Sequence, residues 1–418
     1  MLLALVFSIP TARCESGPDG RGRNPPLEDC SPRGHDNYRT DFAFAIDPSN
    51  TDVLYVGIEY KGVYKSVDRG RTWEKMNNGL KGYPKKENPA GVCIHEIAKI
   101  VIDPSNPRRV LLLRMDSPGT LKDWVTENSG LYESTDGGES WHQILADWMN
   151  AGGSIEGVAI DPSDPRTIYY GAGNQTASWG NADPNRHFVT RGILYKTTDG
   201  GKTWEELPTG LVSDVRCNAI FVDPETPGHL FLTTMAIVRG DTKKSRGMRQ
   251  LGPMMSDDGG KTWTSLADRL PPDYQAIAGA RVAGHHFSHI YLMTQNAGVP
   301  FKGFYSTNGG RVFLESPGAP FLAEFDPHDE FARHMLGVSY GGFLVESWDA
   351  GRAWERSGSL PKQLNQQNIV MELRPTNLVW DPKDPNVIYL TGGHGFVWRS
   401  EDKGKTWTTL LSVERLPD

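Results

Sequence analysis

The octet Thr-Thr-Asp-Gly-Gly-Lys-Thr-Trp at residues 197–204 decides the fold, because its pattern S/T-x-D-x-G-x-T/S-W recurs along the chain. The other six copies are SVDRGRTW (66–73), STDGGESW (134–141), SDDGGKTW (256–263), STNGGRVF (306–313), SWDAGRAW (347–354) and SEDKGKTW (400–407). The copies begin about 56 residues apart on average, and a regular internal period of this kind is typical of repeat architectures. We therefore expect seven similar structural units.

Each position of the octet has a local physical reason. The short side chain of Asp, or of Asn308 in the fifth copy, can hydrogen-bond to the backbone of its own turn. Glycine at the fifth position permits a positive φ. The final Trp, or Phe313, is expected to begin a strand and to pack between neighbouring sheets. The octet is thus predicted to be structural, and we assign it no catalytic role.

A second motif precedes most octets: an apolar strand that ends in Asp-Pro, then a turn and another apolar strand. Examples are FAFAIDPSNTDVLYVG (42–57), GVAIDPSDPRTIYYG (157–171) and NLVWDPKDPNVIYLTG (377–392). Together with the strands on either side of the octet, each repeat holds four short strands, and four-stranded sheets repeated radially form a propeller. The predicted fold is all-β: a seven-bladed β-propeller of four-stranded antiparallel blades over residues 37–418, with a coil arm at 15–36.

Composition excludes several classes of protein. The 418 residues carry 44 Lys and Arg against 51 Asp and Glu, and this net charge of −7 argues against nucleic-acid binding. No apolar run reaches the roughly 18 residues of a membrane span. Four cysteines without a CxxC pair argue against a cysteine-based zinc site. We expect a monomer without metal or cofactor.

The apolar stretch LLALVFSIP (2–10) resembles the hydrophobic core of a signal peptide, although a basic segment before it is missing. Residues 1–14 are therefore predicted to be a signal peptide, and the protein to be secreted or periplasmic.

The site is expected on one face of the ring. The Asp-Pro turns and the octets share a face and are uniform, whereas the loops on the other face vary in length, as functional loops on a rigid scaffold do. Glycoside hydrolysis generally needs two carboxylates about 5 Å or about 6.5–9.5 Å apart. Near the mouth of the central channel on the variable face, the predicted catalytic residues are Asp41, Glu59, Glu96, Glu156 and His95. The predicted substrate-binding residues are Arg39, Lys61, Arg114, Trp124, Trp179, Arg186, His187, Arg216 and His394.

The octets resemble the Asp-box, or BNR, repeats of sialidases, of sortilin-type receptors and of two-propeller xyloglucanases. The resemblance covers about residues 41–410 and implies the propeller fold. The stretch LYVGIEYKGVYKS (54–66) is similar to the first-blade segment in which two-propeller xyloglucanases place a catalytic Asp, with Glu59 at the position of that acid. Lys61-Gly62 replaces the usual Gly-Gly, and the second acid of that family comes from a second propeller, which this sequence does not contain.

Three functions remain open at this level. The first is a carbohydrate-active glycoside hydrolase that works through channel-mouth carboxylates on a poly- or oligosaccharide. The second is a lyase on a uronate-containing polymer, in which His95, His187 and the basic stretch 239–253 would act. The third is a non-catalytic glycan- or protein-binding propeller, as in sortilin-type receptors and photosystem assembly factors. The Glu59 alignment and the Trp-bearing loops favour the hydrolase. A sialidase is a minority alternative, because Tyr38-Arg39-Thr40-Asp41 matches the Arg-Ile-Pro motif poorly.

Overall fold

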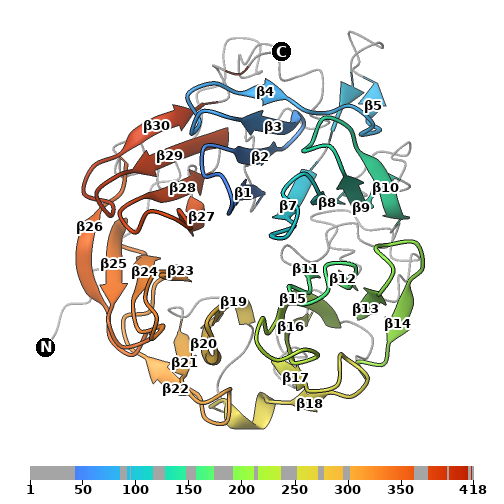
Figure 1. Ribbon diagram of the computed structural model, residues 1–418. Helices are drawn as coiled ribbons and strands as arrows, with labels where there is room; N and C mark the ends of the chain where they lie inside the picture. The colour runs from blue at the N-terminus through green and yellow to red at the C-terminus, as the bar shows by residue number, and fades with distance from the viewer. Residues whose placement is uncertain are drawn as a thin grey trace, which may run out of the picture.

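The computed structural model describes residues 43–84, 92–94, 96–115, 128–146, 157–173, 192–210, 215–236, 252–271, 277–294, 302–361, 375–392, 395–412 and 416. Within these ranges the chain forms seven four-stranded antiparallel sheets, arranged in a ring (Figure 1). The predicted all-β, seven-bladed propeller is confirmed. The predicted signal peptide at 1–14 and coil arm at 15–36 lie outside the described residues.

In every blade the strands follow one another in space in the order of the sequence. The first three blades are β1 (Phe44–Ile46), β2 (Leu54–Ile58), β3 (Gly62–Ser66) and β4 (Glu74–Lys75); β7 (Glu96–Ile102), β8 (Val110–Met115), β9 (Gly130–Ser134) and β10 (His142–Ala146); β11 (Val158–Ile160), β12 (Ile168–Gly173), β13 (Gly192–Thr197) and β14 (Glu205–Leu207). Between the first two blades, β5 (Tyr83–Pro84) pairs with β6 (Val92–Cys93).

The remaining blades have the same design. They are β15 (Val215–Val222), β16 (Leu230–Ala236), β17 (Met254–Ser256) and β18 (Thr264–Ser265); β19 (Ile277–Ala283), β20 (His286–Thr294), β21 (Gly303–Ser306) and β22 (Leu314–Ser316); β23 (Leu322–Phe325), β24 (Met335–Val338), β25 (Phe343–Ser347) and β26 (Glu355–Ser359); β27 (Pro375–Trp380), β28 (Ile388–Gly392), β29 (Phe396–Ser400) and β30 (Thr408–Leu411). A short 3-10 helix at Ala267–Arg269 follows β18.

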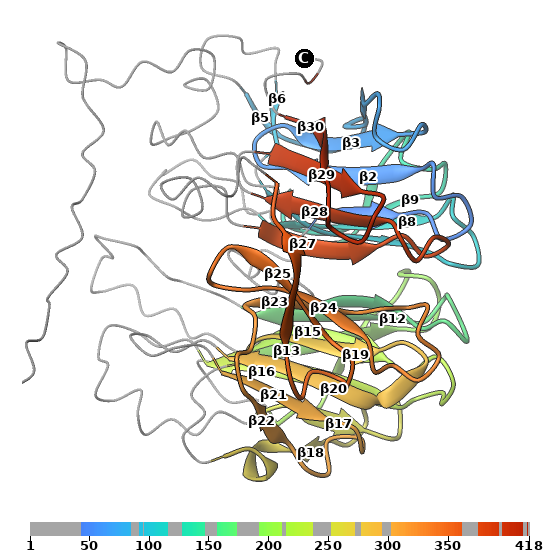
Figure 2. The same cartoon turned by 90° about the vertical axis from the view of Figure 1, so that its left-hand side faces the viewer.

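The strand register separates two faces of the ring. In blade one, Ile46 pairs with Leu54 and Leu54 pairs with Ser66, so the Asp-Pro turn and the octet emerge at the same end of the sheet. We call this end the box face. The opposite end, where β2 turns into β3 and the inner strands begin, is the loop face; Figure 2 shows the ring from the side. The predicted sorting of the two turn types onto one face is confirmed.

The octet turn is stabilised by hydrogen bonds within a few residues. In blade three, the Asp199 carboxylate accepts hydrogen bonds from the hydroxyl of Thr197 at 2.7 Å and from the backbone N–H and hydroxyl of Thr203 at 3.0 and 2.6 Å. Gly201, at φ 93°, donates its N–H to the Thr197 hydroxyl at 3.0 Å. The fold of this turn is thus determined locally, which explains why the same sequence pattern recurs in every blade.

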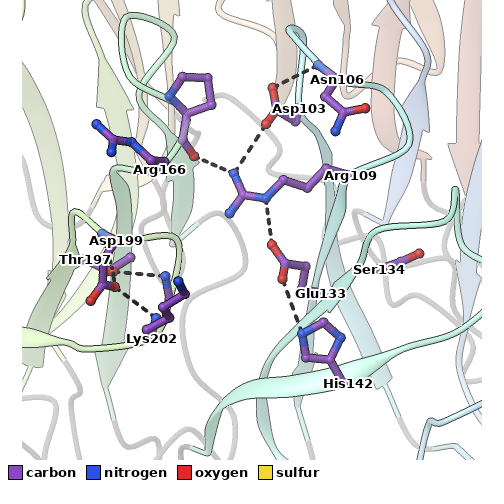
Figure 3. A network of polar contacts seen from close by, with 12 residues as sticks. Asp103, Asn106, Arg109, Glu133, Ser134, His142, Arg166, Thr197, Asp199 and Lys202 are labelled. Atoms are coloured by element: carbon purple, nitrogen blue, oxygen red, sulfur yellow. Dashed lines mark hydrogen bonds and ion pairs between the residues drawn. The ribbon is translucent and has the colours of Figure 1, made fainter.

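Neighbouring blades are joined by buried apolar clusters and by polar contacts on the box face. Figure 3 shows one such contact: Nε of Arg109 lies 2.6 Å from a Glu133 carboxylate oxygen, while Nη1 lies 3.3 Å from Asp103. The same Nη1 donates to the carbonyl of Pro165 in the next blade at 2.5 Å. Glu133 also lies 3.3 Å from Nε2 of His142. Arg109 therefore links blade two to the Asp-Pro turn of blade three.

In the part of the chain that the structure describes, blades one and seven share no strand. Blade one consists only of strands from the start of the described chain, and blade seven only of strands from its end. A buried cluster joins the two, including Phe44 and Val56 of blade one and Tyr389 and Val397 of blade seven. The rings of Phe44 and Tyr389 lie 5.4 Å apart. Within the described residues, side-chain packing therefore closes the ring, and the first inner strand begins at Phe44.

Candidate active site

The structure describes the predicted site residues to different extents. Side chains are described for Glu59, Lys61 and Arg114, and the backbone alone for Glu96 and Arg216. The other predicted residues lie outside the described residues: Arg39, Asp41, His95, Trp124, Glu156, Trp179, Arg186, His187 and His394. The geometry of the site therefore rests on the first two blades.

The turn that carries Glu59 has a defined backbone conformation. It connects Ile58 of β2 to Gly62 of β3, which pair with each other, and Lys61 donates its N–H to the carbonyl of Ile58 at 3.0 Å. Tyr60 and Gly62 both have a positive φ, 63° and 90°. A non-glycine residue in this conformation is uncommon and indicates that the surroundings impose it.

The Asn77 side chain holds this turn from the neighbouring segment. Its amide nitrogen donates to the carbonyl of Lys61 at 2.7 Å, and its oxygen accepts the N–H of Val63 at 2.8 Å. A Cβ on Gly62 would lie 2.3 Å from that amide oxygen, so only glycine leaves room for the contact. Asn77 was not foreseen from the sequence, because nothing local to residue 77 shows that it reaches a turn 14 residues earlier.

The Glu59 turn lies beside the start of the inner strand of blade two. Ile94, which is buried, forms β-bridges with both Tyr60 and Lys61. Two residues later β7 begins at Glu96. In Figure 1, β2 and β7 accordingly lie next to each other at the inner part of the ring. The fold thus brings Glu59 and the backbone of Glu96, which come from different blades, to the same part of the loop face.

Arg114 supports this region from within the protein. It lies on β8 opposite Ile97 of β7, its exposed fraction is 0%, and its guanidinium donates to the backbone carbonyl of Lys81. The sequence analysis predicted that Arg114 binds substrate, but in this conformation the guanidinium has no surface to offer a ligand. We interpret it as a positioning residue for the segment that includes Asn77.

The octet Trp of blade two, Trp141, forms hydrogen bonds to the segment that carries Asn77. The indole N–H of Trp141 donates to the carbonyl of Met76 at 2.8 Å, and its backbone N–H donates to the carbonyl of Asn78 at 2.9 Å. The position of Asn77 is therefore fixed from both sides by blade two. The octet, a repeated structural motif on the box face, thus helps to order a turn on the loop face.

The box face has carboxylates of a different kind. Hydrogen bonds from the hydroxyl and N–H of Thr262, and from Ser256, lower the pKa of Asp258 to about 2. Such a carboxylate is ionised at neutral pH, so it cannot serve as a general acid, which needs a pKa near the operating pH. This agrees with a structural role for the octet.

Among the described residues, no group of three or more His, Cys, Asp or Glu side chains is placed to hold a metal ion.

The BNR/Asp-box repeat model matches residues 132–143. A xyloglucanase of Paenibacillus sp is 21% identical over 380 residues, which span 89% of this chain and 31% of that protein. The structure of an ancestral GH74 enzyme superposes with a TM-score of 0.60 at 14% identity, covering 90% of this chain and 48% of that one. YCF48 from Cyanidioschyzon merolae superposes with a TM-score of 0.50 at 13% identity, covering 90% of this chain and 97% of that one.

The chain spans less than two fifths of the length of each of the curated relatives it matches. These comparisons agree with the seven octets and the seven four-stranded blades. The chain is therefore a β-propeller of BNR/Asp-box repeats whose sequence relatives are xyloglucanases.

Proposed function

We propose that this protein is a glycoside hydrolase that acts on a polysaccharide through carboxylates at the channel mouth on its loop face. The observation that carries the proposal is the pair of bridges from Ile94 to Tyr60 and Lys61, which sets the Glu59 turn beside the start of the strand that begins with Glu96. The xyloglucanase relatives support the choice of a polysaccharide as substrate.

The chemistry requires two acids with different roles. One carboxylic acid protonates the glycosidic oxygen as the bond breaks, and a second carboxylate acts as base toward water or as nucleophile. Glu59 is half-buried on a turn whose backbone is held by Asn77, so its position is well defined. We assign it one of the two roles and look for its partner among Glu96, Asp41 and Glu156. His95 and the predicted basic and aromatic residues other than Arg114 would contact the sugar chain.

A non-catalytic propeller is the second candidate. It is supported by the fold, because YCF48 from Cyanidioschyzon merolae also superposes on this chain, with a TM-score of 0.50. In that case the Glu59 turn would bind a ligand on the loop face without cleaving it.

In the part of the chain that the structure describes, no helix is long and apolar enough to cross a membrane. We propose that the protein acts outside the cytoplasm, on the signal-peptide pattern at 1–14.

The test is release of reducing ends from xyloglucan and from uronic-acid polysaccharides by the purified protein. We expect release by the wild type, and its loss in Glu59→Gln and in Glu96→Gln with thermal stability nearly unchanged. Glu74→Gln, on the exposed outer strand β4, is the matched control and should keep full activity. New ultraviolet absorbance from an unsaturated product would instead establish a lyase. Binding of a polysaccharide without cleavage would establish the non-catalytic function.

A further inference from the structure

The octet of blade six carries an unusual residue at its second position. Trp348 stands there with 62% of its surface exposed, whereas the same position in the other octets is Val67, Thr135, Thr198, Asp257, Thr307 or Glu401. The hydrogen bonds of this turn come from other residues: the Ser347 hydroxyl donates to Asp349 at 2.8 Å and accepts the N–H of Gly351 at 2.9 Å. The turn therefore does not require an indole, and Trp, with its large apolar ring and polar N–H, is enriched at contact surfaces.

The Trp348 ring is held flat against the protein. It stacks on the imidazole of His334, with ring centroids 3.9 Å apart and an angle of 16° between the planes. His334 itself is only 2% exposed. Because a buried ring covers one face of the indole, the exposed area of Trp348 lies on its other face and edges.

The imidazole beneath is fixed in turn. Nδ1 of His334 lies 2.7 Å from a carboxylate oxygen of Asp326, and the edge of Trp380 packs against the same ring with centroids 5.6 Å apart. Burial tends to raise the pKa of Asp326, but the hydrogen bond from His334 and a backbone hydrogen bond from His328 outweigh it and lower this pKa. Asp326 is therefore a carboxylate at neutral pH and a firm acceptor for His334. The indole rests on a rigid support before any ligand arrives.

Other polar and aromatic groups of the same blade lie beside His334 or close to it in the sequence. A carboxylate oxygen of Glu346 lies 3.6 Å from Nε2 of His334, and the Glu346 side chain is 30% exposed. Nε2 of His334 is buried and has no hydrogen-bond partner among the described residues. Phe331, which is 54% exposed, lies under the guanidinium of Arg333 at 5.4 Å. A flat apolar surface beside hydrogen-bonding groups suits a ligand that is apolar on one side and rich in hydroxyls at its edge.

We propose that Trp348 is a stacking platform for a pyranose ring of a neutral polysaccharide, on the box face of blade six and separate from the loop face. The axial C–H groups of a pyranose lie over the electron-rich indole face, and its equatorial hydroxyls donate to the Glu346 carboxylate. The Glu346 carboxylate beside His334 disfavours an anionic sugar and accepts hydrogen bonds from hydroxyls, which suits a neutral one. The substrate class rests on the proposed function, whereas the platform itself rests on the geometry of Trp348 and His334.

The platform would hold a long polymer on the face opposite the candidate active site. Cleavage of a polysaccharide would then benefit from it, whereas cleavage of a short oligosaccharide, which cannot reach both faces, would not. This difference provides a readout that a purely structural role of Trp348 would not produce.

The test compares Trp348→Ala with Val67→Ala, which removes an exposed apolar side chain at the same octet position of blade one. Retention in gels that contain xyloglucan is measured for both, with circular dichroism to confirm folding. We expect Trp348→Ala to weaken binding by about tenfold, in line with the loss of one aromatic stacking contact, and Val67→Ala to leave it unchanged. Trp348→Phe, which keeps a ring, should bind with intermediate strength.

Equal retention of Trp348→Ala and the wild type would overturn the inference, even if the protein hydrolyses xyloglucan. Loss of retention in Trp348→Ala would support it even if no hydrolysis is found, so the two proposals fail independently. If Trp348→Ala does not fold, Trp348→Phe and the wild type decide. The inference is overturned if Trp348→Phe is retained as strongly as the wild type and if xyloglucan does not change the tryptophan fluorescence of the wild type. Weakened self-association of Trp348→Ala with unchanged glycan retention would also overturn it, in favour of a protein partner.

Discussion

Single residues show how the octet combines a local and a non-local role. The Asp and the first hydroxyl residue form the turn, while the Trp at the end packs against the neighbouring blade. In blade three, Trp204 is half-buried against a cluster that includes Leu131 and Ile193, and its indole N–H donates to the carbonyl of Gly201 at 3.1 Å. The two roles can be separated by mutation.

Replacing Trp204 with Ala should lower the free energy of unfolding by about 2–3 kcal/mol, less than the 3–5 kcal/mol typical of a fully buried large aromatic, because the indole is partly exposed. Thr198→Ala, at the exposed second position of the same octet, should change it by less than about 0.5 kcal/mol. Denaturant unfolding of both variants measures the difference. Equal stability of the two would contradict the packing role of the octet Trp.

The octet carboxylates should also determine how stability depends on pH. Hydrogen bonds within the turn lower the pKa of Asp258 to about 2; in Asp136, burial tends to raise the pKa, but bonds from Ser134 and Ser140 outweigh it and lower the pKa, again to about 2. Since the folded pKa is below the unfolded value of about 4, the stabilisation is complete above pH 4 and is lost as the pH falls toward 2. Melting temperature should therefore fall steeply over that range.

Asn308 provides the control for this effect within the molecule. It replaces the Asp in blade five and still accepts hydrogen bonds from Ser306 at 2.9 Å and from the N–H of Val312 at 3.1 Å, without a titratable group. The double variant Asp258→Asn, Asp136→Asn should thus keep the fold at pH 7. Its melting temperature should fall less than that of the wild type as the pH falls from 4 toward 2. An equal fall in the double variant and the wild type would show that the octets do not control acid unfolding.

At the scale of elements, the β2–β3 turn is ordered by residues that come later in the chain. Asn77 binds both sides of the turn, and Trp141 of blade two fixes the segment that carries Asn77. The position of Glu59 therefore depends on contacts between two blades. Catalytic groups lose much of their effect when they are displaced by about 1 Å.

Asn77→Ala should therefore reduce kcat on xyloglucan by at least about tenfold while lowering the melting temperature only slightly. Asn78→Ala is the matched control: its side chain is exposed, and only its backbone carbonyl takes part, as acceptor for Trp141. Steady-state kinetics on the two variants, with thermal melts alongside, give the comparison. Wild-type kcat in Asn77→Ala would mean that the turn does not need this support.

At the scale of the whole molecule, the seam between blades one and seven is the point where the ring could open. Among the described strands, none is exchanged across it. It is held by the cluster around Phe44 and Tyr389 and by hydrogen bonds such as that from the Arg399 guanidinium to the carbonyl of Arg69 at 3.1 Å. Lys383 also donates to the carbonyl of Ser49. Among the described residues, side-chain packing and side-chain hydrogen bonds therefore close the propeller.

Phe44→Ala should cost about 3–5 kcal/mol in unfolding free energy, as expected for a buried aromatic, and should speed amide hydrogen exchange in β27–β30 as well as in β1–β4. Val158→Ala, at the corresponding first position of inner strand β11, is the control. Its effect on exchange should stay within blades two and three, whose residues share its cluster. Faster exchange confined to blade one in Phe44→Ala would show that the seam is not the weak point.

The sequence by itself determined the repeat unit, and with it the number of blades. The octet and the Asp-Pro turn form hydrogen bonds between residues at most a few positions apart, so their patterns can be read directly, as at Asp199 and Asp47. It also indicated Glu59 as a turn residue, because the continuous apolar run of β2 stops there.

Only the tertiary structure decided what lies beside each of these turns. The bridges from Ile94 to Tyr60 and Lys61, the burial of Arg114 and the stacking of Trp348 on His334 all join residues from different strands or blades. Such contacts depend on how strands pack within a blade and against the next blade, and no local pattern encodes that packing. The octet turns follow from interactions over about five residues, whereas the candidate sites follow from contacts between strands that are far apart in the sequence.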